Sequence, residues 1–359
     1  MIHRRPRACA LALALAAAAT AAAATATAAT AAPAPRLRRP LPPFSAIDPA
    51  FTPYTIDGAV NYAVIPAMAA IAARAGVDVL LLGGSNGEWP SLTLDERLRL
   101  LAAWRAALDG LPSNASSPAP LLMFHVGSTA LADAVALAAA AEAARADLIL
   151  SIAPGVVFGG AATSASTVVA NLAAISAAAP RTPLVYYHYP AIYAVDVSIA
   201  ALVAAAKNSS VAGGPPEGDA VRTLAGVKYI DTQLVDLAVA QAASAAHGLG
   251  VAFYPQLPVV LAAAPLGAAG TPCFTPFAGL AKAVPAALAR GDVPAAAAAM
   301  ARVMELSRIL AVYGGTPGGR AIYEHVYGLA LGAVRAPQAD LDPATVAAML
   351  AELRAAGLL

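Results

Sequence analysis

The chain has 359 residues, a formal net charge of +1, 59% hydrophobic residues and 12% charged residues. This length can bury a large core in one or two domains, and a charge near zero without basic runs in the body argues against a nucleic-acid binder. Two cysteines exclude a disulfide scaffold and a cysteine-rich zinc module, and five scattered histidines without an HExxH pair disfavour a metal hydrolase.

Residues 1–32 are predicted to be a targeting segment. Three arginines near the start precede a long uncharged Ala/Thr-rich run with Ala-x-Ala steps, which is the layout of a secretory signal peptide. The run is too weakly hydrophobic for a stable membrane anchor, so we expect secretion or an endomembrane lumen and no membrane partner. A plastid or mitochondrial transit peptide is the alternative, because no acidic residue precedes Asp48. Residues 33–44 then predict an exposed Pro/Arg-rich linker.

The body of the chain alternates strand and helix signals. Short runs rich in Val, Ile, Leu, Tyr and Phe are each followed by an alanine-rich helical stretch, and such repeated units indicate a parallel sheet. Eight units suit a closed (β/α)8 TIM barrel over residues 45–290, an α/β fold, better than an open doubly wound sheet. The predicted strands are residues 45–51, 77–82, 121–126, 148–152, 183–187, 225–229, 250–254 and, most weakly, 267–273.

Capping signals mark several helices. Thr93 and Glu96 have the spacing of a capping box, in which a hydroxyl and a carboxylate satisfy free N–H groups of the first turn. From residue 291 the chain shows only helical patterns, which predict a small C-terminal helical domain over 291–359. Its last helix is expected to start at Asp342 and Pro343 and to end at Gly357. The Gly/Pro-rich stretch 212–219 predicts an inserted loop.

Lys228 is the first candidate for chemistry. The chain has only three lysines, and Lys228 alone interrupts an apolar strand, at its C-terminal end, where TIM barrels gather function. Lost hydration disfavours the charged amine and lowers its pKa, and a neutral amine can attack a ketone to form a Schiff base. The alternative is a structural lysine that pairs with a carboxylate such as Asp231.

Two further groups are expected at the same end of the barrel. Ser85 and Asn86 lie between two glycines after the second strand, where side chains and exposed N–H groups can bind a carboxylate. Tyr187 ends the fifth strand, next to the strand of Lys228, and its hydroxyl can move a proton. Taken alone, the glycine-flanked segment is more typical of an ordinary strand–helix turn, and a single tyrosine is more typical of aromatic core packing.

Several motifs together resemble one family. They are Thr52-Pro53, GGSNGEWPSLTLDER at 83–97, HVGST at 125–129, YYHYP at 186–190, GVKYIDTQLVDL at 226–237 and LGAAG at 266–270. Because these motifs occur together and in this order, the chain resembles the N-acetylneuraminate lyase / dihydrodipicolinate synthase family of pyruvate-dependent class I aldolases. The resemblance covers nearly everything from about residue 46 to the C-terminus, and the YYHYP and KYIDTQLVDL segments look most like animal-type sialic acid lyases.

The resemblance implies roles for the candidate residues. Lys228 matches the Schiff-base lysine, Tyr187 the tyrosine that moves a proton at the aldehyde oxygen, and Ser85 with Asn86 the pair that holds the pyruvate carboxylate. It also implies a 2-keto acid substrate, no metal or organic cofactor, and a homo-oligomer, a tetramer. The GSNGE form with Asn86 looks more like 4-hydroxy-2-oxoglutarate aldolases.

The chain also departs from the family pattern. The stretch 155–157 lacks the tyrosine pair of the synthases, and the stretch after strand seven, at 254–258, lacks the two acids that grip the sugar in sialic acid lyases. Ile230 stands where a hydroxyl is common, and the serine expected after strand eight is replaced near Cys273. The pyruvate half of the site is therefore expected to be intact and the aldehyde half altered.

The sequence thus predicts a pyruvate-dependent carbon–carbon lyase. The favoured reaction is the cleavage of N-acetylneuraminate to N-acetylmannosamine and pyruvate. The alternatives are 4-hydroxy-2-oxoglutarate aldolase, dihydrodipicolinate synthase and, from another class, a secreted binding protein that kept the barrel and lost turnover.

Overall fold

The computed structural model describes residues 37–112, 118–153, 163–207 and 220–359. The chain divides into two compact units, Met1–Ala34 and Pro35–Leu359, and all described residues belong to the second. The predicted targeting segment 1–32, the stretch 155–157 and the predicted loop 212–219 lie outside the described residues. Within the described part, no helix combines the length and apolar character needed to cross a bilayer.

The described residues form an eight-stranded parallel barrel, as the alternating pattern predicts. The strand order is β7-β6-β5-β4-β3-β2-β1-β8. Between β7 and β8, the Ala269 N–H donates to the Phe253 carbonyl at 2.8 Å and the Thr271 hydroxyl donates to the Pro255 carbonyl at 2.8 Å, so the barrel is nearly closed. The strands are β1 (Ser45–Pro49), β2 (Val79–Leu82), β3 (Leu121–His125), β4 (Leu148–Ile152), β5 (Leu184–His188), β6 (Leu224–Tyr229), β7 (Ala252–Pro255) and β8 (Gly270–Pro272).

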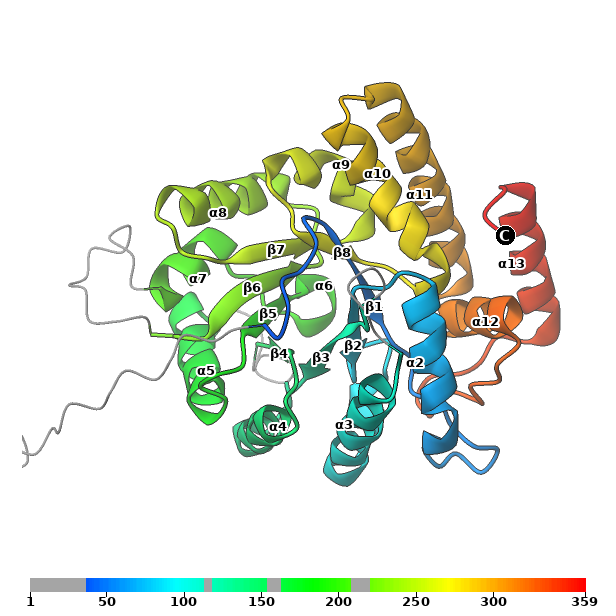
Figure 1. The fold of residues 1–359 in the computed structure, drawn as a ribbon, viewed down its shortest axis with the longest axis horizontal. Coiled ribbons are helices and arrows are strands. Elements are labelled where there is room, and N and C mark those ends of the chain that lie inside the picture. The colour runs from blue at the N-terminus through cyan, green and yellow to red at the C-terminus, as the bar shows by residue number, and fades with distance from the viewer. Residues whose placement is uncertain (1–36, 113–117, 154–162, 208–219) are drawn as a thin grey trace, which may run out of the picture. The chain divides into compact units, whose positions relative to one another are not determined.

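Helices alternate with the strands and surround them (Figure 1). Local signals fix several helix starts: the predicted capping box of Thr93 and Glu96 is present, and Asp342 caps the last helix. The helices are α2 (Ile65–Arg74), α3 (Leu94–Asp109), α4 (Leu131–Ala143), α5 (Ala165–Ala178), α6 (Pro190–Tyr193), α7 (Ile199–Ala206), α8 (Leu234–Ala246), α9 (Val260–Ala263), α10 (Ala278–Ala289), α11 (Val293–Tyr313), α12 (Gly315–Tyr327) and α13 (Pro343–Ala355).

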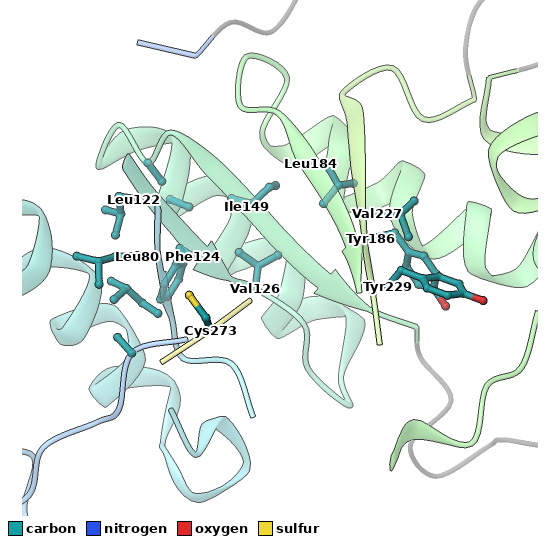
Figure 2. Packing of buried hydrophobic residues seen from close by; sticks show 14 of the residues in the cluster. Leu80, Leu122, Phe124, Val126, Ile149, Leu184, Tyr186, Val227, Tyr229 and Cys273 are labelled. Carbon is teal, nitrogen blue, oxygen red and sulfur yellow. The ribbon is translucent and has the colours of Figure 1, made fainter. Parts of the chain in front are cut away.

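Alternating side chains of each strand build two apolar layers. Residues such as Leu81 and Leu150 fill the barrel interior, whereas Leu80, Ile149 and Val227 face the helices. Figure 2 shows part of the outer layer, in which large side chains of neighbouring strands pack together. On β6 this alternation turns Val227 outward and Lys228 inward.

The segment before β1 is partly packed, in contrast to the exposed linker expected over 33–44. Leu37 and Leu41 pack against the apolar cluster inside the barrel. Arg38 forms an ion pair with Asp147, whose carboxylate is fully buried. Because Arg38 and Asp147 are 109 positions apart, local composition did not reveal their contact.

The C-terminal helices are present and share their core with the barrel. Leu306, Ile322, Met349 and Leu353 form a cluster of their own between α11, α12 and α13. Val303 of α11 nevertheless belongs to the main cluster that covers the strands. These helices therefore lie close enough to the barrel to take part in a site at its rim.

Candidate active site

Lys228 lies in a row of inward-facing residues that runs across three strands. Its neighbours in register are Tyr187 on β5 and Tyr254 on β7. All three side chains are at least 96% buried. The row lies near the C-terminal ends of the strands, which is where barrel enzymes carry their chemistry.

Burial controls the protonation state of the Lys228 amine. Desolvation lowers the pKa of this amine well below its usual value of 10.5. Its Nζ lies 3.5 Å from the centre of the Tyr187 ring. The alternative pairing with Asp231 is not present among the described ion pairs, and a carboxylate oxygen of Asp231 lies 3.6 Å from Nε2 of His188. The amine is thus held on an aromatic face, in surroundings that favour its neutral and nucleophilic form.

A chain of hydroxyl groups leads away from Tyr187. The Ser85 hydroxyl lies 3.3 Å from the Tyr187 hydroxyl and 2.8 Å from that of Tyr193, and the Trp89 indole donates to Tyr193 at 3.2 Å. An indole N–H can only donate, so the Tyr193 proton is free for Ser85 and the Ser85 proton for Tyr187. Burial raises the pKa of Tyr187, so the Tyr187 hydroxyl holds its proton and can present it to a ligand.

The turn after β2 brings Ser85 and Asn86 to the same place. Gly87 allows the turn to be tight, because a Cβ there would lie 3.0 Å from the Gly83 backbone and 3.1 Å from the Ala50 carbonyl. The Asn86 side-chain oxygen accepts a hydrogen bond from the Thr316 hydroxyl at 2.8 Å. The Asn86 amide N–H groups are thereby left to donate to a carboxylate.

A buried ionic group fixes this turn to the C-terminal part of the chain. Glu88 is fully buried, accepts from the Arg335 backbone N–H at 3.0 Å, and lies 3.5 Å from the Arg320 guanidinium. Arg320 also donates to the carbonyls of Thr52 and Leu331. Burial raises the pKa of Glu88 and lowers that of Arg320, each toward the neutral form.

Sequence reasoning missed three contributors to the site: Tyr193, Thr316 and the Arg320–Glu88 pair. Tyr193 follows the YYHYP segment by three residues, but nothing local shows that the short helix α6 returns it toward Ser85. The other contacts join residues more than 200 positions apart. The one local signal of these contributors in the sequence is an acid, Glu88, directly after the GSNG turn.

The four predicted site residues line a single cavity of about 630 Å³. This volume is in the range of small-molecule sites. Its walls come from the ends of β1, β5, β6, β7 and β8, from the turn after β2, and from the start of α12 and the middle of α11. The lining residues are Pro49, Ser85, Asn86, Tyr187, Tyr189, Ile192, Lys228, Ile230, Gln256, Leu257, Pro258, Pro272, Cys273, Phe274, Phe277, Leu306, Ser307, Leu310, Ala311, Gly315 and Thr316.

Two other sets of side chains carry atoms of a type that can react or bind a metal: the Cys273 thiol and a cluster around His188. Cys273 is buried and unbonded to sulfur, and burial raises the pKa of its thiol, which fits the expected role as a small apolar residue. His188, Asp196 and Asp231 bring possible metal-ligand atoms within 4.8 Å of one another. None of these three residues lines the cavity, and the His188 ring stacks on Tyr229.

The chain matches known proteins over different lengths. N-acetylneuraminate lyase of Danio rerio is 30% identical over 188 residues, which are 52% of this chain and 54% of that protein. The chain thus matches about half the length of this relative. Among solved structures, the Proteus mirabilis N-acetylneuraminate lyase aligns with a TM-score of 0.75 and 24% identity over 88% of this chain and 99% of that one.

A third similarity is to a prophage protein of the dihydrodipicolinic acid synthase family from E. coli K12, solved in complex with pyruvate. It aligns with a TM-score of 0.71 and 21% identity over 88% of this chain and 99% of that chain. At this identity the two structural matches show the fold alone. The model of the dihydrodipicolinate synthetase family matches residues 44–236, more than half of the chain, and includes the turn, Tyr187 and Lys228. The chain therefore belongs to the dihydrodipicolinate synthetase family.

Proposed function

We propose that the chain is a pyruvate-dependent class I aldolase that forms a Schiff base on Lys228. The observation that carries this proposal is the placement of a buried amine, 3.5 Å from the Tyr187 ring, in one cavity with the Ser85–Asn86 turn. Both the family and the pyruvate complex of one structural neighbour support a 2-keto acid as the substrate.

In the proposed cleavage, the neutral Lys228 amine adds to the keto carbon of a 4-hydroxy-2-oxo acid and water leaves. The resulting iminium accepts the electron pair of the C3–C4 bond, so the bond breaks and an enamine forms. Tyr187 gives its proton to the hydroxyl that leaves as water, and its phenolate oxygen then takes the proton of the C4 hydroxyl as the aldehyde departs. Protonation of the enamine at C3 and hydrolysis then release pyruvate and regenerate the amine.

The other groups orient the acid and stabilise charge. We expect the Ser85 backbone N–H, the Asn86 amide and nearby backbone N–H groups to hold the substrate carboxylate, since the Ser85 hydroxyl proton is directed at Tyr187. When Tyr187 gives its proton in the reverse condensation, the hydrogen bond from Ser85 stabilises the phenolate that forms. The iminium itself carries the positive charge that balances the carboxylate.

The aldehyde partner distinguishes the possible reactions. The names of the curated relatives favour cleavage of N-acetylneuraminate to N-acetylmannosamine and pyruvate. The 4-hydroxy-2-oxoglutarate aldolase and dihydrodipicolinate synthase reactions share the pyruvate half with this reaction. Gln256, Leu257 and Pro258, which follow β7, offer no acid to a sugar.

Reductive trapping tests the proposal. The full chain is incubated with pyruvate and sodium borohydride, and its peptides are analysed by mass spectrometry. We expect an adduct on Lys228, its loss in Lys228→Arg, and its persistence in the matched control Lys282→Arg, because Lys282 pairs with Asp78. An adduct on Lys207 or Lys282 would refute the assignment. Trapping without cleavage of any 2-keto acid would instead favour the binding protein.

A further inference from the structure

The cavity is markedly apolar beyond its pyruvate-binding half. Ile230 after β6, Leu257 after β7, and Leu306 and Leu310 of α11 all line it. Among the described lining residues, only Lys228 is of a type that carries charge at neutral pH. A second substrate that brings its own carboxylate would therefore meet no other side-chain cation among the described residues, and the enamine that attacks it is neutral.

Three polar side chains in this part each donate one hydrogen bond within the protein. Gln256 donates to the Asp231 carbonyl at 3.0 Å, and Ser307 donates to the Val303 carbonyl at 2.8 Å. Thr316 donates to the Asn86 side chain at 2.8 Å. A polyhydroxylated ligand would find the second Gln256 N–H, the Tyr189 hydroxyl and the acceptor oxygens of these side chains, but no charged partner among the described lining residues other than Lys228. Each buried hydroxyl left unpaired weakens binding.

Phe274 gives the cavity a fixed aromatic face. Its half-buried ring stacks on Phe51, with ring centres 5.3 Å apart. A Cβ at position 319 would lie 2.7 Å from the Phe274 ring, so Gly319 allows the chain to pack directly behind it. Both the backbone N–H and the hydroxyl of Thr275 donate to buried Asp48, which holds the adjoining backbone. The ring is therefore supported from behind while it lines the cavity.

We propose that the aldehyde partner is a neutral aldehyde with an apolar chain or an aromatic ring, rather than an amino sugar or an aldehyde acid. This inference rests on the proposed aldolase function. In the condensation, C3 of the pyruvate enamine bonds to the aldehyde carbon, and the aldehyde oxygen takes the Tyr187 proton. Hydrolysis then frees a 4-hydroxy-2-oxo acid whose apolar group lies against Leu310 and Phe274.

A competition among aldehydes tests the inference. The full chain is supplied with pyruvate and, in separate reactions, benzaldehyde, hexanal, N-acetylmannosamine or glyoxylate, and the condensation products are quantified by liquid chromatography and mass spectrometry. We expect kcat/KM for benzaldehyde or hexanal to exceed that for the sugar by about tenfold or more, since one unpaired buried hydroxyl costs about that factor. It should also exceed that for glyoxylate, because the carboxylate of glyoxylate would be buried without a cation.

The outcomes separate the two proposals. If pyruvate is trapped on Lys228 but the sugar or glyoxylate is preferred, or the apolar aldehydes do not react, the inference on the aldehyde is wrong and the aldolase proposal stands. If pyruvate forms no adduct on Lys228, the aldolase proposal itself fails.

Variants of the apolar wall provide a second test. Ile230→Thr keeps a β-branched side chain and adds a hydroxyl two residues beyond Lys228, so we expect the ratio of kcat/KM for hexanal to that for N-acetylmannosamine to fall severalfold. Phe274→Leu should lower the preference for benzaldehyde over hexanal. Ile56→Thr makes the first change at a fully exposed position and serves as the control. Trapping at Lys228 verifies that each variant is folded, and unchanged ratios in both wall variants would contradict the inference.

Discussion

At Lys228, the loss of water sets the chemistry of the amine. The side chain is 4% exposed, and desolvation is the cause of its lowered pKa. The face of the Tyr187 ring attracts positive charge and so opposes this shift, but an aromatic face offsets only part of a full burial penalty. Burial thus favours the neutral form of the Lys228 amine, which is the form that the proposed imine formation requires.

The pH dependence of trapping follows from the direction of this shift. Only the neutral amine attacks, and it predominates above its own pKa. Because the pKa is well below 10.5, the trapping rate with pyruvate and cyanoborohydride should rise with pH to a plateau whose midpoint lies well below 10.5. The rate should decline as the pH falls through that midpoint. N-acetyl-lysine in the same buffers is the control, and a shared midpoint would contradict the assignment.

Tyr193 is expected to act as a positioning residue through Ser85. Tyr193→Phe removes the donor to Ser85 and leaves the pyruvate contacts in place, because Tyr193 does not line the cavity. We expect kcat to fall about tenfold, as for the loss of one hydrogen bond worth about 1.4 kcal/mol, with KM for the 2-keto acid almost unchanged. Steady-state kinetics with any accepted aldehyde measures both constants.

Tyr62→Phe is the matched control, because the Tyr62 hydroxyl has no hydrogen-bond partner among the described residues. A Tyr193→Phe enzyme with unchanged kcat, or with changes in KM alone, would show that the hydroxyl chain does not assist Tyr187. Thermal melting of both variants separates a kinetic effect from loss of the fold.

At the level of elements, the strands were predictable and the contacts between distant elements were not. Buried strands are short apolar runs bounded by turn residues, so each predicted strand overlaps an observed one. The weakest prediction, 267–273, contains the three-residue strand β8. The position of Lys228 at the carboxyl end of its predicted strand likewise marked it as a candidate site residue. Hydrogen bonds such as Asn86 to Thr316 have no local pattern, so the sequence did not show that α11 and α12 complete the cavity.

The Arg320–Glu88 pair is predicted to stabilise the turn that carries Ser85 and Asn86. Arg320→Met leaves Glu88 as a buried acid without its cation, and removes donors from the carbonyls of Thr52 and Leu331. Loss of one member of a buried pair costs about 3–5 kcal/mol, so urea unfolding should show a decrease of that order. Adding Glu88→Gln should restore part of the loss, because it removes the unpaired charge.

Arg308→Met is a suitable control for that series, since Arg308 makes its ion pairs with Glu305 and Glu352 at the surface. Exposed pairs contribute little, so its unfolding midpoint should stay almost the same. If Arg308→Met and Arg320→Met lower the free energy of unfolding equally, the buried pair stabilises the protein no more than a surface pair does.

Across the whole molecule, the barrel and the C-terminal helices are expected to unfold together. Residues Pro35–Leu359 form one compact unit, and the core that covers the strands continues into Val303 of α11 and Tyr323 of α12. Both tryptophans, Trp89 and Trp104, belong to the barrel, whereas the far-ultraviolet signal reports on all helices. Thermal unfolding followed by fluorescence and by circular dichroism should therefore give coincident transitions.

A helical transition at lower temperature, with the fluorescence unchanged, would show that the C-terminal helices are an independent domain. In that case the cavity wall that α11 supplies could open without loss of the barrel, and the substrate preference inferred from that wall would depend on temperature.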